Sequence, residues 1–118
     1  MNGRLTTHVL DTANGRPAAG MTIELWSWSA GHTKLLKTVR TNDDGRIDAP
    51  LLAGADLAAG AYELVFYVGD YFARLGHASP DPRFLDRVPV RFAIADPSAH
   101  YHVPLLVSPW SYTTYRGS

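Results

Sequence analysis

Residues 100–108, HYHVPLLVS, have the alternating pattern of a β-strand. Successive strand residues point to opposite faces of a sheet. One face therefore takes the apolar side chains Tyr101, Val103, Leu105 and Val107. The other face takes His100 and His102, which place two imidazoles side by side. The segment predicts a strand that lines a hydrophobic core on one face and carries ionisable groups on the other.

The same alternation recurs along most of the chain. Further strands are predicted at residues 4–10, 21–28, 34–41, 62–69, 88–95 and 110–115. Residues 49–61 are a connection of small residues that can hold one short strand, and Pro89 places its strand near a sheet edge. One short helix is expected at residues 70–75, with Asp70 as its N-cap and Gly76 as its stop. About eight strands and one short helix predict an all-β, two-sheet antiparallel sandwich in a single domain over residues 1–118.

Composition limits the classes of function. The 118 residues carry no formal net charge and have a pI near 7.0, whereas a nucleic-acid or anionic-membrane partner normally requires a basic excess. No apolar run approaches the roughly 20 residues that span a bilayer. The first residues, MNGRLTTHVLDT, lack the apolar segment of a secretory signal, and we expect a cytoplasmic protein.

Several kinds of catalytic site are absent from the sequence. The chain has no cysteine, which excludes disulfides, thiolate metal ligands and cysteine nucleophiles. It also lacks the GxSxG, GxxxxGK[ST] and GxGxxG motifs. The remaining candidates for chemistry are histidine, arginine and hydroxyl side chains.

Histidines are the first of these candidates. His8 shares a predicted strand face with Arg4 and Thr6, and on the pattern alone exposure to solvent is its simpler interpretation. His100 and His102 could bind zinc, share a proton or face water. Zinc needs three or four protein ligands, and no spacing demands a third, so we rank metal binding below proton chemistry.

Two further candidates lie in a turn and at the end of the chain. Arg46 follows Asp44-Gly45, a pair that favours a tight turn, and its planar guanidinium suits a ligand with adjacent oxygens. Residues 111–118, SYTTYRGS, hold two tyrosines, an arginine and hydroxyls. They form either an edge strand that frays or a terminus that contributes to a site.

Four segments resemble the 5-hydroxyisourate hydrolases, the transthyretin-related enzymes of urate breakdown. They are LTTHVLDTANGRPAAGM (5–21), TNDDGR (41–46), FLDRVPVRFAIAD (84–96) and HYHVPLLVSPWSYTTYRGS (100–118). The resemblance covers essentially the whole chain in order. The terminal YRGS is its most specific element, because it distinguishes the hydrolases from hormone-carrying transthyretin.

The resemblance implies a transthyretin-like sandwich, assembled as a homotetramer with sites at the dimer–dimer interface. It implies ring opening of 5-hydroxyisourate to 2-oxo-4-hydroxy-4-carboxy-5-ureidoimidazoline. We expect no cofactor and no metal. Transferred motif by motif, the implied catalytic residues are His8, Arg46, His102 and Ser118. The implied substrate-binding residues are Arg46, Tyr115, Arg116, Gly117 and Ser118.

The implied roles assign water activation to the pair His8 and His102, and stabilisation of negative charge to Arg46. Three alternatives remain. They are a small-ligand carrier without catalysis, a zinc hydrolase using His8, His100 and His102, and a non-enzymatic interaction module.

Overall fold

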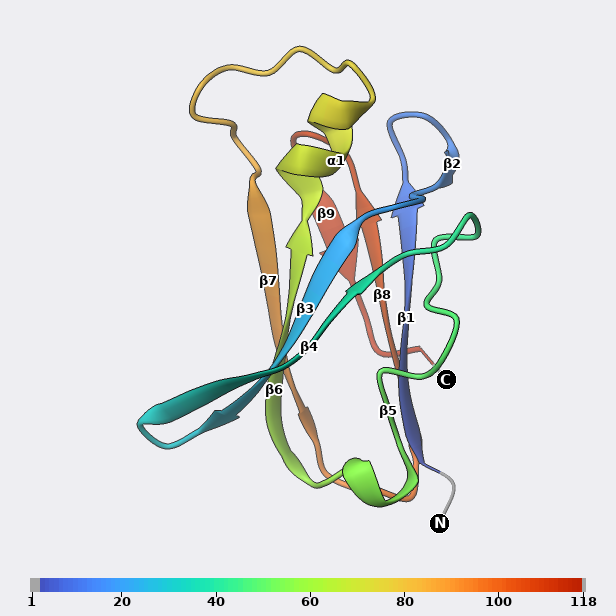
Figure 1. Ribbon diagram of the computed structural model, residues 1–118, viewed down its shortest axis with the longest axis vertical. Helices are drawn as coiled ribbons and strands as arrows, with labels where there is room; N and C mark the ends of the chain where they lie inside the picture. The colour runs from blue at the N-terminus through green and yellow to red at the C-terminus, as the bar shows by residue number, and fades with distance from the viewer. Residues whose placement is uncertain (1–2, 118) are drawn as a thin grey trace.

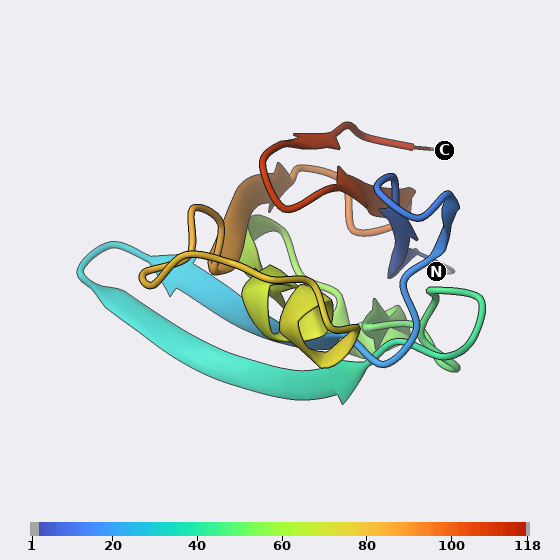
Figure 2. The ribbon, with the colours of Figure 1, turned by 90° about the horizontal axis from the view of Figure 1, so that it is seen from above.

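Two β-sheets packed face to face form the protein, seen in a computed structural model that describes residues 3–117 (Figures 1 and 2). The elements are β1 (Arg4–Asp11), β2 (Arg16–Pro17), β3 (Thr22–Ser29), β4 (His32–Arg40), β5 (Leu52–Ala53), the 3₁₀ turn η1 (Gly54–Asp56), β6 (Gly60–Tyr67), α1 (Val68–Arg74), β7 (Arg87–Ile94), β8 (His100–Val107) and β9 (Tyr112–Thr114). One sheet has the order β2-β1-β8-β9, with β5 also paired to β1, and the other has the order β4-β3-β6-β7.

This architecture confirms the predicted two-sheet sandwich with one short helix. The pairs are antiparallel except β1 with β8, which run parallel. Strand β7 lies at a sheet edge, as Pro89 predicted. The small-residue connection does hold a short strand, β5, whereas β2 lies where the sequence indicated only a turn.

Alternating apolar residues from both sheets meet in one core. Leu5 and Val9 of β1, and Ile23 and Leu25 of β3, are completely buried. Burying such a side chain contributes about 1.5–3 kcal/mol. Thr7 is also buried, and its hydroxyl donates to the carbonyl of Val103 at 2.7 Å. The alternation that buries these residues sends their neighbours on β1 to the outer face.

Helix α1 begins earlier than the sequence predicted. Its first residue is Val68, the residue before it makes no side-chain capping bond, and the expected N-cap role of Asp70 is wrong. Burial of Val68 starts the helix directly at the end of β6, and the Asp70 carboxylate instead accepts from Arg83 Nη1 at 2.7 Å. The predicted stop is confirmed, because Gly76 has a φ of 84° and its N–H donates to the carbonyl of Ala73. Among residues 3–117, no helix is long and apolar enough to cross a membrane.

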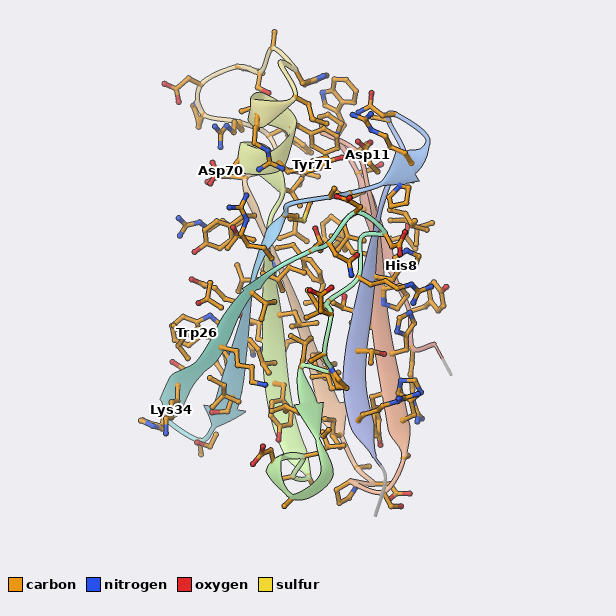
Figure 3. The ribbon with its side chains drawn as sticks, turned by 45° about the vertical axis from the view of Figure 1, so that its right-hand side comes forward. His8, Asp11, Trp26, Lys34, Asp70 and Tyr71 are labelled. Carbon is orange, nitrogen blue, oxygen red and sulfur yellow. The ribbon has the colours of Figure 1, made fainter. Side chains whose placement is uncertain are left out.

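A buried aspartate joins β1 to α1 (Figure 3). Asp11 is 1% exposed, and its carboxylate accepts from Tyr71 Oη at 2.8 Å and from the backbone and side-chain nitrogens of Asn14. Burial acts to raise the pKa of Asp11, but the hydrogen bonds from Asn14 and Tyr71 hold it below its usual value. Burial and the bond to Asp11 raise the pKa of Tyr71 to about 12. Asp11 therefore holds the helix against the end of β1.

Candidate active site

The candidate site lies on the outer face of the sheet that contains β1 and β8. Their parallel register pairs Thr6 with His102 and His8 with Pro104. Alternation along each strand puts Thr6, His8 and the two β8 histidines on the face away from the core. The sequence predicted this shared face separately for each strand, and the parallel pairing brings the two sets together.

A tight turn places Arg46 beside this face. The Asn42 Oδ1 accepts the backbone N–H groups of Asp44 and Arg46 at 2.9 and 3.1 Å. Gly45 has a φ of 75°, and any Cβ there would collide with the carbonyl of Val9, so the turn requires glycine. The Val9 N–H donates to the Gly45 carbonyl at 2.8 Å, and Arg46 forms a backbone bridge with His8. The turn thus docks on β1 and presents Arg46 to the site.

His8 is held by the same turn. Its ring is partly buried, and its Nε2 lies 2.8 Å from the carbonyl oxygen of Asp44. Because a carbonyl only accepts hydrogen bonds, Nε2 carries a hydrogen in this arrangement. Figure 3 shows His8 on the side of β1 turned away from the body of the sandwich. Simple solvation, the interpretation favoured by the pattern alone, does not describe a ring that is fixed in this way.

A threonine joins the two histidines of β8. The Thr6 Oγ1 lies 2.8 Å from His102 Nδ1 and 3.0 Å from His100 Nε2. Thr6 was not among the residues that the sequence indicated as functional. The pattern placed it on the face of His8, but only the pairing of β1 with β8 reveals its contact with the histidines.

His102 is electrostatically distinct among the site residues. Burial, followed by the positive charge of Arg46 and the nearby His100 and His8, lowers its pKa below the ordinary value for histidine. The ring is therefore neutral near pH 7. A neutral imidazole in a polar cleft can accept a proton from water.

The C-terminal segment packs against His102. The Gly117 N–H donates to the His102 carbonyl at 2.7 Å, and a Cβ at Gly117 would lie 2.8 Å from His102 Cδ2. The Tyr115 side chain is exposed, and the Arg116 guanidinium lies 4.1 Å from the centre of the Tyr101 ring. Ser118, the remaining predicted residue of the tail, lies outside the described residues.

Two hollows meet at the β8 histidines. The first is a cleft of about 450 Å³ lined by Arg4, Thr6, Thr7, Arg46, Ile47, Asp48, Ala49, Pro50, His100 and His102. The second is lined by Ala99, His100, His102, Tyr115, Arg116 and Gly117. The structure thus brings Arg46, His102 and the described part of the tail around one region, with His8 beside Arg46. Within residues 3–117, no three histidine, aspartate or glutamate side chains are arranged to hold a metal ion.

Comparison with known proteins supports one family. Residues 5–117 match the model described as "HIUase/Transthyretin family". The chain is 60% identical over 117 residues to a protein of Rhizobium meliloti named 5-hydroxyisourate hydrolase 2, covering 99% of this chain and 98% of that protein.

Two solved structures extend the match. The crystal structure of an (S)-allantoin synthase shares 50% identity and a TM-score of 0.94 over 99% of this chain, which spans only 44% of that longer chain. The structure of 5-hydroxyisourate hydrolase from Klebsiella pneumoniae shares 37% identity and a TM-score of 0.82, covering 98% of this chain and 99% of that one. The chain belongs to the HIUase/transthyretin family.

Proposed function

We propose that this protein hydrolyses 5-hydroxyisourate to 2-oxo-4-hydroxy-4-carboxy-5-ureidoimidazoline. The observation that carries the proposal is the placement of a neutral, partly buried His102 in a cleft with Arg46. Relatives named 5-hydroxyisourate hydrolase, which match over nearly their whole length, support this choice of substrate. The reaction opens the six-membered ring by breaking an N–C(=O) bond and needs an activated water, a stabilised oxyanion and a proton for the leaving nitrogen.

His102 acts as the general base in this mechanism. Its Nδ1 is engaged with Thr6, so the free Nε2 takes a proton from water as the water oxygen bonds to the substrate carbonyl carbon. The carbonyl oxygen then carries negative charge. When the C–N bond breaks, His102 returns the proton on Nε2 to the leaving nitrogen, and the carbonyl becomes a carboxylic acid, which ionises. The lowered pKa of His102 keeps this base in its reactive form near neutral pH.

Arg46 and His8 assist from the turn side of the cleft. The Arg46 guanidinium offsets the negative charge that develops on the substrate oxygen, an effect often amounting to about 2.7–4 kcal/mol for one donor. His8 donates through Nε2 to Asp44, which steadies the turn that carries Arg46. In this role His8 orients Arg46 and stands beside the reacting groups.

The C-terminal residues form the opposite wall in our proposal. Gly117 holds the tail to His102, and the exposed Tyr115 closes the second hollow. Arg116 is turned toward Tyr101 and lines the hollow beside His100. We assign Ser118 to hydrogen bonding with substrate or water, because it completes the YRGS motif.

The outer face that carries the site is also the face where we expect the chains to assemble. We propose a homotetramer of single-domain chains, a dimer of dimers, in which a second copy covers the outer face of the β1–β8–β9 sheet. Open hollows on that face and the exposed aromatic rings of Trp110, Tyr112 and Tyr115 support this arrangement. We place the enzyme in the cytoplasm on the basis of its composition. Light scattering coupled to size-exclusion chromatography tests the assembly, and a monomer at working concentration would contradict it.

A transthyretin-like carrier is the alternative function. The cleft is lined largely by arginine, histidine and threonine side chains, which suit an oxygen-rich substrate better than an apolar hormone. Turnover separates the two functions, because a carrier binds its ligand without converting it.

The test is the absorbance decay of freshly generated 5-hydroxyisourate. The wild-type protein should accelerate the decay above the spontaneous rate, while His102→Ala and Arg46→Ala should lower kcat/KM by roughly 10²-fold or more. Lys34→Ala is the matched control, because Lys34 lies on exposed β4 of the other sheet (Figure 3). Activity that persists in the presence of metal chelators would exclude a zinc hydrolase. Binding without acceleration would favour the carrier.

A further inference from the structure

Thr6 is the centre of a hydrogen-bonded row that includes His100 as well as His102. Its Oγ1 lies 3.0 Å from His100 Nε2 and 2.8 Å from His102 Nδ1. A hydroxyl group has one proton and can accept through its lone pairs. It cannot donate to both nitrogens at once, so at least one of the two nitrogens carries a hydrogen. The tautomers of His100 and His102 are therefore coupled through Thr6.

The sheet fixes this row. Thr6 and His102 are register partners in the parallel pair of β1 and β8, and Arg4 is the partner of His100. Thr6 consequently stands between the two histidines on the outer face. The β1–β8 pairing runs without interruption from Arg4 and His100 to Asp11 and Val107. Next to the row, β5 holds the other side of β1 at Arg4 and Leu5, and the bridge to Gly117 holds the other side of β8 at His102. This backbone pairing keeps the hydroxyl and the rings at bonding distance.

Only one arrangement of the row frees His102 Nε2 and satisfies every donor within it. In that arrangement His102 Nδ1–H donates to Thr6 Oγ1, and the Thr6 hydroxyl donates to His100 Nε2. His100 then carries its own hydrogen on Nδ1. The opposite arrangement, in which Thr6 donates to His102 Nδ1, puts the His102 hydrogen on Nε2 and removes the lone pair that would receive a proton from water.

We propose that Thr6 is a positioning residue that holds the hydrogen of His102 on Nδ1 and relays a proton from His102 to His100. This inference rests on the proposed hydrolysis. After Nε2 has taken a proton from water, His102 is an imidazolium. Its Nδ1 proton passes to the Thr6 oxygen as the Thr6 proton passes to His100 Nε2. His102 is then neutral with its hydrogen on Nε2, and His100 carries the positive charge. When the C–N bond breaks, the two transfers reverse, and His102 gives its Nε2 proton to the leaving nitrogen and returns to the form with hydrogen on Nδ1.

The electrostatic surroundings favour such sharing of charge. Ionisable groups around the His102 ring come from every neighbouring element: Arg4 and His8 on β1, Arg46 and Asp48 on the turn segment, His100 on β8, and Tyr115 and Arg116 on the tail. Among the described residues that line the two hollows, the three arginines outnumber the one aspartate, so a positive charge confined to His102 is unfavourable. A second imidazole connected through Thr6 spreads that charge over two rings.

The experiment combines ¹⁵N NMR of histidine-labelled protein with pH profiles of kcat/KM. Above its pKa, wild-type His102 should show hydrogen on Nδ1 and a free Nε2. Thr6→Val keeps the shape of the side chain but removes the hydroxyl, so His102 should no longer be held in the single tautomer with hydrogen on Nδ1. We expect kcat/KM to fall at least about tenfold, part of the roughly 10²–10⁴-fold that acid–base groups contribute, with a shifted acid limb.

Conservative and control variants complete the design. Thr6→Ser should restore both the tautomer and the pH profile, because it restores the hydroxyl. His100→Gln offers Thr6 a partner that cannot take up a proton, so it should lower kcat/KM while His102 keeps hydrogen on Nδ1. Thr38→Val on exposed β4 controls for loss of a threonine hydroxyl, and circular dichroism confirms folding.

Two results would overturn the inference. One is wild-type His102 with its hydrogen on Nε2, and the other is a Thr6→Val protein with an unchanged tautomer and pH profile. The NMR measurement needs no substrate. A wild-type protein that shows the expected tautomer but does not hydrolyse 5-hydroxyisourate would contradict the proposed function and the relay in catalysis, while leaving the positioning role of Thr6 supported.

Discussion

Gly117→Ala adds one methyl group at the point where the tail touches His102. In the structure that methyl carbon would lie 2.8, 3.2 and 3.3 Å from three atoms of His102, whereas ordinary van der Waals contact begins at 3.4 Å. The ring and the tail must therefore separate by at least about 0.6 Å at the closest pair. The Gly117 N–H also donates to the His102 carbonyl at 2.7 Å, so the tail cannot withdraw without weakening a hydrogen bond that contributes about 0.5–1.5 kcal/mol.

A displacement of this size at a catalytic base is costly. A misplacement of about 1 Å can lower the rate about 10²-fold. We expect Gly117→Ala to reduce kcat/KM for 5-hydroxyisourate by roughly 10- to 100-fold. Thermal stability should change little, because the tail contributes few buried contacts. The assay is the initial rate of absorbance decay, measured at several substrate concentrations beside a thermal melt.

The control for this experiment is Gly31→Ala in the β3–β4 hairpin. A Cβ at Gly31 meets nothing within 4 Å, although its φ of 69° makes alanine there strained. Gly31→Ala should therefore lower stability slightly and leave kcat/KM unchanged. If Gly117→Ala has wild-type kcat/KM while retaining its tail, the contact with His102 does not position the base and the reasoning is wrong.

Three further predictions concern charge, stability and the tail. Arg46→Gln removes a positive charge that lowers the pKa of His102, so the acid limb of the kcat/KM profile should move up toward the ordinary histidine pKa of about 6.5. If the acid limb does not move, it does not report the titration of His102. Tyr71→Phe removes a donor to the buried Asp11 carboxylate and should reduce the free energy of unfolding by about 1–3 kcal/mol in urea titrations. An unchanged free energy would show that the bond between Tyr71 and Asp11 does not hold the helix in place. Deleting residues 115–118 should leave a folded protein with little activity, and full turnover by that protein would contradict a role for the tail.

The sequence predicted the strands well because burial and alternation coincide in them. Ile23 and Leu25 on β3, like Val103 and Leu105 on β8, are buried where the pattern places them. The helix start was predicted less well for a tertiary reason. Asp70 is a good capping residue in isolation, but the burial of Val68 against the core decides where the helix begins.

The candidate site could also be predicted from the sequence only in part. Two histidines two residues apart on a strand must share a face, so the pairing of His100 with His102 could be predicted. The contact of Thr6 with both could not, because it depends on the parallel pairing of β1 with β8, which brings together residues 94 and 96 positions apart in the chain. The fixed ring of His8 depends likewise on a docked turn, which the sequence showed only as a turn.

The most direct measurement is the decay of freshly generated 5-hydroxyisourate with equal concentrations of wild-type and His102→Ala protein. We expect the wild type to accelerate the decay well above the spontaneous rate, and His102→Ala, shown to be folded, to lose most of that acceleration. A wild-type protein that leaves the spontaneous rate unchanged, or a His102→Ala protein as active as the wild type, would contradict this expectation.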